Sequence, residues 1–342
     1  MASNRPMLQT WRRLYDAAGR LKDLAPWEWM TEADVFGVQH PETSDLGFVS
    51  IMGMLGEHYA VTVYLGPEAL DQFWALQQAG PSGNPERVLE IPQLQASFEN
   101  RDMLRKQEHD LIKQLGLKFR GRQAWPLFRS FRPGFVPWFL ELHEVQFLSL
   151  ILDQVSEVAV RLQDRATLLP SPDERHYLIR VSQQVGGHLV WEDRIQQLPT
   201  PEPKPISIAV DVEMLNALKR LPQQRHTLEV DLFMAPSGVQ EKGARPFYPY
   251  ILLIVEARSG YILATDMLSP EPSLETMWGE IPQRLLSHLA QAEWVPKTIH
   301  VRSPLLVGLL DPIAGELDFQ LKSARTLPGL DSVREFLLER FM

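Results

Sequence analysis

Three strand-like runs in close succession, within residues 225–268, constrain the fold of this chain more than any other feature. The runs are RHTLEVDLFM, YILLIVEA and YILATDML, and turn-forming residues separate them. Consecutive strands joined by short turns pair antiparallel. The strand-like runs that follow, at 297–303 and 318–324, are each preceded by a helix pattern, which favours parallel pairing. The order therefore predicts a mixed sheet with helices on its faces.

A proline-rich segment, PTPEPKP at residues 199–205, is the clearest linker pattern in the chain. The 342 residues also exceed what a single hydrophobic core usually accommodates. We therefore expect two domains. The first is an α+β domain over residues 1–199, and the second is an α/β domain over residues 200–342 that contains the mixed sheet.

The N-terminal half carries both helix and strand patterns. Apolar residues recur at helical spacing over 7–24 and 67–79, and the most apolar helix pattern covers 143–163, which we expect to pack centrally. Strand pairs are predicted around the turn at Pro133–Gly134 and near Gly186–Gly187. Further strand-like runs occupy residues 34–39, 46–53, 58–66 and 87–99.

The composition limits the partners of the chain. Its formal net charge of −9 and pI near 5.5 argue against broad electrostatic binding to nucleic acid or to anionic membranes. The absence of cysteine excludes disulfides, thiolate zinc sites and cysteine nucleophiles, and it fits a reducing compartment. The N-terminus lacks a signal-peptide pattern and the apolar runs are too short to span a bilayer, so we expect a soluble cytoplasmic protein that does not contact membranes.

The region from residue 225 onward resembles the ribonuclease H/retroviral-integrase superfamily in element order and in a first strand that carries Asp231. In that superfamily, clustered carboxylates hold two divalent metal ions that cleave phosphodiesters. The resemblance implies catalytic acids at Asp231 and, on the last helix, at Glu335. The second acid should lie in the segment HVRSP, but Arg302 and Ser303 stand there instead, and a cation at that position repels metal ions.

Asp231 therefore has two interpretations. As a catalytic acid it needs further carboxylates, for which Asp266 near the end of the third strand could substitute. As a scaffold residue it shares the less buried face of its strand with Glu229 and Phe233. The opposite face then carries Leu228, Val230, Leu232 and Met234. The alternation favours the second interpretation and a catalytically degenerate, ribonuclease H-like domain.

Three segments resemble a family of uncharacterised two-domain bacterial proteins: APWEWM at 25–30, residues 34–66, and RPFYPY at 245–250. The resemblance covers most of the chain and implies no particular activity. The sequence contains no phosphate-binding P-loop, no dinucleotide-binding glycine motif and no nucleophile elbow, so we expect no cofactor.

The N-terminal domain supplies candidate residues for a cleft, namely Trp27, Trp29, Glu57 and His58. In GMLGEH, residues 53–58, a turn could present Glu57 and His58 at a cleft mouth as an acid/base pair. The alternative is a tight turn that the two glycines permit. It is favoured because neighbouring residues on a strand point to opposite faces. The histidines lack the spacing of a metal site, so no metal is predicted.

One basic run, KFRGRQAWPLFRSFR at residues 118–132, stands out against the acidic background. Guanidinium groups and rings in this run could bind the phosphates and bases of a single-stranded nucleic acid. The candidates are Arg120, Arg122, Trp125, Arg129 and Arg132. In the alternative, the aromatic residues face the core and the Arg residues pair with carboxylates elsewhere, which the net charge of −9 favours. Nucleic acid is thus a less favoured partner, and a protein partner also fits.

These observations favour a non-enzymatic binding or interaction protein on a degenerate ribonuclease H-like scaffold. Two alternatives stay open. One is a metal-dependent nuclease or phosphodiesterase that uses Asp231 and Glu335, and the other is a small-molecule enzyme with a site between the domains.

Overall fold

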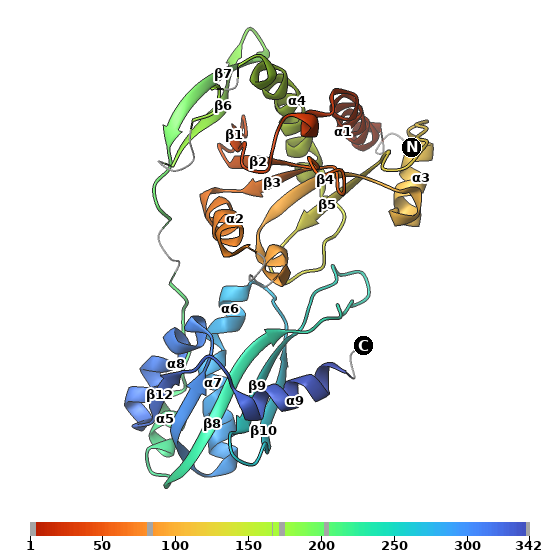
Figure 1. The fold of residues 1–342 in the computed structure, drawn as a ribbon. Coiled ribbons are helices and arrows are strands. Elements are labelled where there is room, and N and C mark those ends of the chain that lie inside the picture. Colours follow the sequence, from red (N-terminus) through yellow and green to blue (C-terminus); the bar gives the residue numbers. More distant parts are fainter. Residues whose placement is uncertain (1–4, 81–84, 166, 171–174, 202–204, 340–342) are drawn as a thin grey trace. The chain divides into compact units, whose positions relative to one another are not determined.

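The computed structural model describes residues 5–80, 85–165, 167–170, 175–201 and 205–339, so part of the proline-rich linker lies outside the described residues. The chain forms two compact units (Figure 1). The first unit comprises Met1–Arg132 and Pro137–Glu202, and the second comprises Pro133–Val136 and Pro203–Met342.

A seven-stranded sheet forms the centre of the first unit, in the order β5-β4-β3-β2-β1-β6-β7. Its strands are β1 (Phe36–Gln39), β2 (Leu46–Met52), β3 (Ala60–Leu65), β4 (Gln93–Glu99), β5 (Trp125–Phe131), β6 (His176–Val185) and β7 (His188–Gln197). Neighbouring strands pair antiparallel except β1 and β6, which are parallel. This sheet and its helices confirm the predicted α+β class.

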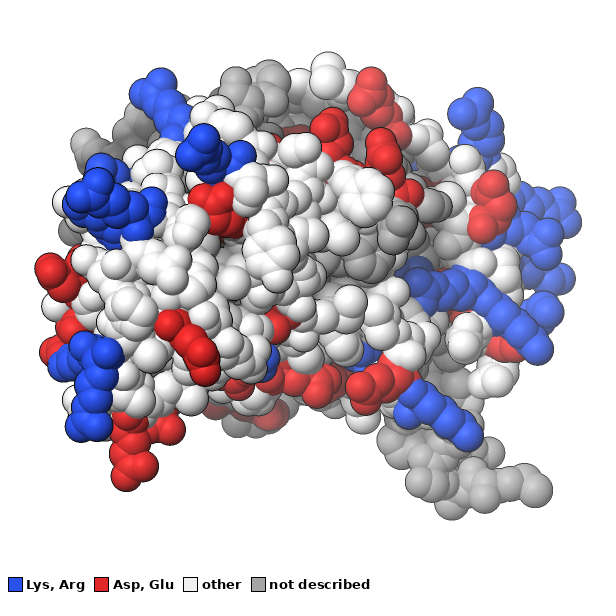
Figure 2. All heavy atoms as spheres, turned by 90° about the horizontal axis from the view of Figure 1, so that it is seen from below, with Lys and Arg blue, Asp and Glu red and all other residues white. Residues whose placement is uncertain are grey.

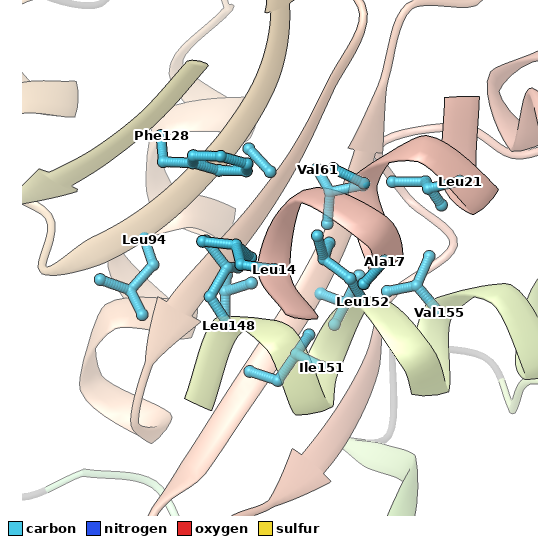
Figure 3. Close-up of a cluster of buried hydrophobic side chains, with 14 of the residues drawn as sticks. Leu14, Ala17, Leu21, Val61, Leu94, Phe128, Leu148, Ile151, Leu152 and Val155 are labelled. Carbon is cyan, nitrogen blue, oxygen red and sulfur yellow. The ribbon is translucent and has the colours of Figure 1, made fainter. Parts of the chain in front are cut away.

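Helices cover both faces of this sheet. On one face lie α1 (Arg5–Leu24) and α4 (Leu142–Asp164), and on the other lies α2 (Pro67–Ala79). Figure 3 shows the first of these two cores, with Leu14, Ala17 and Leu21 from α1, Leu148, Ile151, Leu152 and Val155 from α4, and Val61, Leu94 and Phe128 from the strands. The apolar pattern over residues 143–163 therefore does mark a central helix, as predicted.

A five-stranded mixed sheet forms the second unit, in the order β10-β9-β8-β11-β12. Its strands are β8 (Gln223–Met234), β9 (Tyr250–Glu256), β10 (Ile262–Leu268), β11 (Val295–Val301) and β12 (Gln320–Ser323). The first three pair antiparallel, whereas β11 is parallel to β8 and to β12. The predicted mixed sheet is thereby confirmed.

Two apolar cores sandwich this second sheet. The larger core packs one face of the sheet against α5 (Val212–Leu218), α6 (Leu274–Gly279), α7 (Ile281–Ala292) and α8 (Pro304–Leu317). The smaller core packs the other face against α9 (Pro328–Leu338). Within the described part of the chain, no helix has the length and apolarity needed to cross a bilayer.

Prolines mark several boundaries of the observed elements. The helix pattern over 273–292 contains Pro282, which lacks the N–H that a continuous helix needs and is therefore expected to kink or split it. The segment does divide into α6 and α7, as expected. The second strand predicted after the turn at Pro133 does not form. Only Ser130 and Trp138 bridge there, and Phe135 pairs with Phe247 instead.

The strand predicted over 87–99 is also shorter than expected. A 3-10 helix, η4 (Pro85–Glu90), occupies its first residues, and β4 begins only at Gln93. Pro92 has no N–H to donate to a sheet, so the strand starts after it.

Replacing Leu152 by Ala tests the central role of α4. Leu152 is fully buried, so the loss of its side chain leaves a cavity and should lower the free energy of unfolding by about 3 kcal/mol. Urea denaturation followed by tryptophan fluorescence measures this, since most of the nine Trp residues lie in the first unit. Val160→Ala on the same helix is the matched control, because Val160 is 46% exposed and its truncation should cost less than about 0.5 kcal/mol. Equal losses in the two variants would contradict the packing described for α4.

Candidate functional site

Asp231 lies in the middle of β8 on the face of the sheet that α9 covers. As the alternation predicts, Glu229 and Phe233 share this face. The expectation that this face is the less buried one is wrong at Asp231, because both acidic residues are only 3% exposed. The alternation of residues identified the face correctly, but α9, which is distant in sequence, covers it.

Arg302 follows the last residue of β11 and reaches the buried carboxylate of Asp231. Its Nε lies 3.1 Å from Asp231 Oδ2, and the two groups form an ion pair. The Nε–H group itself makes no hydrogen bond to the carboxylate. Its second arm donates a hydrogen bond to Asp331 in the first turn of α9. One guanidinium therefore joins the central strand, the end of β11 and the helix that covers them.

The pKa values of the two carboxylates around Arg302 are shifted in opposite directions. Burial raises the pKa of Asp231, and the nearby charges of Arg302 and Arg334 oppose that shift without cancelling it. Burial alone would also raise the pKa of Asp331, but hydrogen bonds from Arg302 and from the backbone N–H of Leu327 lower it overall. The ionised form of Asp231 is thus the costly one, and it depends on its cation.

Neighbouring groups complete this cluster without adding a free carboxylate. Glu229 accepts the backbone N–H of Leu330 at 2.7 Å, and the guanidinium of Arg334 lies 4.4 Å from the ring centroid of Phe233. Strand alternation alone indicated Glu229, because a residue two positions before Asp231 must share its face. Asp331 and Arg334 could not be placed before the path of α9 was known.

This set of side chains does not fit a pair of metal ions. Two divalent cations need several carboxylates free of internal cations, and here a guanidinium already bridges Asp231 and Asp331. Glu335 lies on the exposed side of α9, and Asp266 pairs with His288, whose Nε2 is 2.8 Å from Asp266 Oδ2. Among the residues that the structure describes, no three His, Asp or Glu side chains are arranged to hold a metal. The catalytic role of Asp231 and Glu335 stays a prediction without structural support.

A second candidate site is a cavity of about 430 Å³ in the first unit, beside the GMLGEH segment. The segment makes the predicted tight turn. Gly56 donates its N–H to the carbonyl of Gly53 at 2.8 Å, and both glycines have positive φ angles. Glu57 and His58 line this cavity together with Glu32 and Trp74. Phe73, Ile51 and Met52 supply apolar wall.

The other two cleft candidates pack against the core of the first unit, Trp27 buried and Trp29 half-buried. Trp27 is 5% exposed, its ring lies 4.8 Å from that of Tyr59, and the ammonium group of Lys22 lies over both rings. Trp29 donates its indole N–H to the carbonyl of Ala159 at 3.0 Å. Neither tryptophan lines the cavity, whose wall instead carries Trp74.

Glu57 and His58 do not pair with each other in this turn. His58 Nδ1 lies 3.4 Å from Glu99 Oε1, whereas the side chain of Glu57 is exposed. The possible acid/base pair of Glu57 and His58 is therefore not formed. The cavity presents carboxylates and aromatic rings to a ligand, without a proton relay between these two residues.

The second half of the basic run at 118–132 is tied to the protein itself. Arg129 forms an ion pair with the buried Glu108, and Arg132 bonds both Glu141 and Glu144. Phe128 is buried in the core, and Trp125 packs partly buried against it. Arg120 and Arg122 are exposed.

These contacts agree with the amphipathic alternative for the run, in which the rings face the core and Arg side chains pair with carboxylates. Figure 2 shows, on the face it views, Lys and Arg side chains interspersed with Asp and Glu around a broad uncharged area. Nucleic-acid binding by Arg120, Arg122, Trp125, Arg129 and Arg132 stays a prediction.

Replacing Arg302 by Met tests the ion-pair cluster. The buried Asp231 then loses its nearest cation, and the free energy of unfolding should fall by about 2 kcal/mol near neutral pH, less than for a fully buried pair because Arg302 is partly exposed. The folded-state pKa of Asp231 rises further above its unfolded value, so protonation favours the folded state. The deficit relative to wild type should therefore shrink as the pH falls from about 7 to about 5, measured by urea unfolding.

The double variant Arg302→Met/Asp231→Asn is the control for that test. It removes both charges of the ion pair, while Glu229 keeps its hydrogen bond from Leu330, and it should recover most of the lost stability at neutral pH. A single variant as stable as wild type at every pH would show that the ion pair contributes nothing.

Two family comparisons cover most of the chain. Residues 11–180 match a domain of unknown function (DUF7309), and residues 214–338 match a second domain of unknown function (DUF6930). A search of curated proteins found no match. Neither family carries an established activity, and neither match bears on the ribonuclease H-like resemblance. The predicted resemblance to uncharacterised two-domain proteins is confirmed, since two domains of unknown function follow one another along the chain.

Proposed function

We propose that this protein is a non-enzymatic binding protein whose C-terminal domain is a ribonuclease H-like scaffold without metal chemistry. The observation that carries the proposal is the position of Arg302, between the carboxylates of Asp231 and Asp331. In the superfamily resemblance, metal ions would be held next to Asp231, and a guanidinium there supplies their positive charge without their Lewis acidity.

The topology of the second sheet supports the scaffold part of this proposal. Three antiparallel strands, β10-β9-β8, are followed by β11 and β12, both parallel to β8, and Asp231 lies on the central strand. This is the arrangement that the resemblance implies, with a closing helix, α9, against the face that carries Asp231.

The binding part of the proposal rests on the cavity in the first unit. Glu32 and Glu57 place two carboxylates on its wall, and Trp74 adds an aromatic ring beside an apolar floor. Glu32 accepts a hydrogen bond from Gln77, a neutral group, and no described residue forms an ion pair with either Glu32 or Glu57. Carboxylates combined with an aromatic face favour a ligand that joins a protonated amine to an apolar body.

The absence of nuclease chemistry can be tested directly. Titration of the full-length protein with Mn²⁺ in a calorimeter should give no heat of binding at millimolar metal, and a labelled oligonucleotide should remain intact with Mn²⁺ or Mg²⁺ present. Asp231→Asn and Glu335→Gln are the diagnostic variants. Hydrolysis by the wild-type protein that both variants abolish would overturn the proposal.

The ligand class can be tested with a matched pair of probes. 2-Phenylethylamine should bind the first unit measurably by ligand-detected NMR, whereas 2-phenylethanol, which lacks the charge, should bind more weakly. Glu57→Gln should raise the Kd for the amine about threefold, the range expected for one exposed ion pair. Glu68→Gln on α2, outside the cavity wall, should leave the Kd unchanged. Equal binding of both probes would contradict the role of the carboxylates.

A further inference from the structure

Strand β7 is an edge strand whose outer side is unpaired within the described sheet. It is ten residues long and lies at the end of the seven-stranded order, beside β6 in the green hairpin of Figure 1. Three of its apolar side chains are strongly exposed, with Leu189 at 42%, Val190 at 52% and Ile195 at 57%. The centre of the strand carries three charged residues, Glu192, Asp193 and Arg194. Such charges protect an edge against unspecific pairing, and they leave pairing with a strand of matching charge pattern possible.

The hairpin geometry fixes which backbone groups of β7 point outward. Val185 pairs with His188 across a two-residue turn in which Gly186 and Gly187 both have positive φ angles. The residues that flank such a turn exchange their hydrogen bonds, and bonding then alternates along the strand. Even-numbered residues of β7 therefore bond to β6, and odd-numbered residues from 189 to 197 direct their N–H and C=O groups away from the sheet.

Alternation also restricts how two copies of β7 can pair antiparallel. Each hydrogen-bonded pair between the two copies must join two odd-numbered residues. The twofold axis therefore has to place one residue directly opposite its own equivalent in the second copy. It cannot lie midway between two neighbouring residues. An axis at Glu192 would place that carboxylate opposite itself, and an axis at Arg194 would place two guanidinium groups together.

We propose that two copies of the chain associate through antiparallel pairing of β7, with the twofold axis at Asp193. Within one copy Glu192 and Arg194 already form an exposed ion pair with each other. This register places each of them opposite the oppositely charged residue of the second copy, so the two ion pairs come together as a network of four alternating charges.

The same register also places Trp191 opposite Ile195 on the other face of the ribbon, while Val190 and Leu189 lie opposite Gln196 and Gln197. The result is a continuous sheet across two copies, which removes the exposed edge of each. The inference identifies a partner for the binding protein proposed above, but it does not depend on the cavity.

The axis brings the two copies of Asp193 together, and the structure supplies the charge to tolerate this. Within each copy, Asp193 accepts hydrogen bonds from Arg161 and, at 2.6 Å, from the buried Arg180. The hydrogen bond from Arg161 is the main reason that the pKa of Asp193 lies below its usual value. Glu157 shares the same two guanidinium groups within each copy. The two Asp193 carboxylates at the axis are therefore each neutralised inside their own copy before they meet.

Charge exchange tests the register. By sedimentation velocity the wild-type chain should be a dimer, and Glu192→Arg should raise the dimer Kd about tenfold or more, because two attractive cross-strand pairs become repulsive. The double variant Glu192→Arg/Arg194→Glu restores opposite charges at both pairs and should recover the dimer. Thermal melting of each variant distinguishes loss of association from loss of folding. A monomeric wild-type chain, or a dimer that neither charge change affects, would overturn the proposal.

Crosslinking tests the axis independently, and the chain contains no cysteine to interfere. At the axis the two Cα atoms of residue 193 should lie about 5.5 Å apart, within the span of a disulfide, so Asp193→Cys should form a covalent dimer on oxidation. Leu189→Cys is the matched control. Its two copies would be about 27 Å apart in this register, so it should not crosslink. Crosslinking through residue 189 but not through residue 193 would show that the register is wrong.

Discussion

The second unit depends on how one buried carboxylate is neutralised. Asp231 sits on the central strand with 3% of its surface exposed, and an ionised group in such a place is unstable without a cation. Arg302 supplies that cation, and its second arm holds Asp331, so the same interaction attaches α9 to the sheet. The contacts of Arg302 therefore both neutralise the buried carboxylate of Asp231 and hold α9 against the sheet. The guanidinium of Arg302 lies beside Asp231, where the ribonuclease H-like resemblance would place metal ions.

Much of this could be predicted from the sequence, because strands and helices leave periodic patterns that need no knowledge of their neighbours. The alternation around Asp231 identified its face, and the segment HVRSP indicated that Arg302 could meet Asp231, as it does. Burial of that face could not be predicted, because it depends on where α9 packs. The absence of the strand predicted after Pro133 also depends on a contact distant in sequence, because Phe135 pairs with Phe247.

The basic run at 118–132 shows how local composition can leave two interpretations open that only the fold distinguishes for individual residues. Basic residues between aromatic ones are typical of nucleic-acid surfaces, and nothing within the run argues against that interpretation. The partners of Arg129 and Arg132 are Glu108, Glu141 and Glu144, none of which belongs to the run. In a chain with net charge −9, basic residues find carboxylates readily, so a cluster of positive charge indicates internal pairing as well as a binding surface.

The N-terminus of α9 shows that a helix can take its cap from another element. Leu327 at its N-cap makes no side-chain hydrogen bond, and the backbone N–H of Leu330 is satisfied by Glu229 of β8. Gly329 permits this approach, because an added Cβ would lie 3.0 Å from the carbonyl of Ala257. Away from the sheet, α9 has neither this cap nor its apolar partners. Its formation and its docking are therefore a single cooperative event.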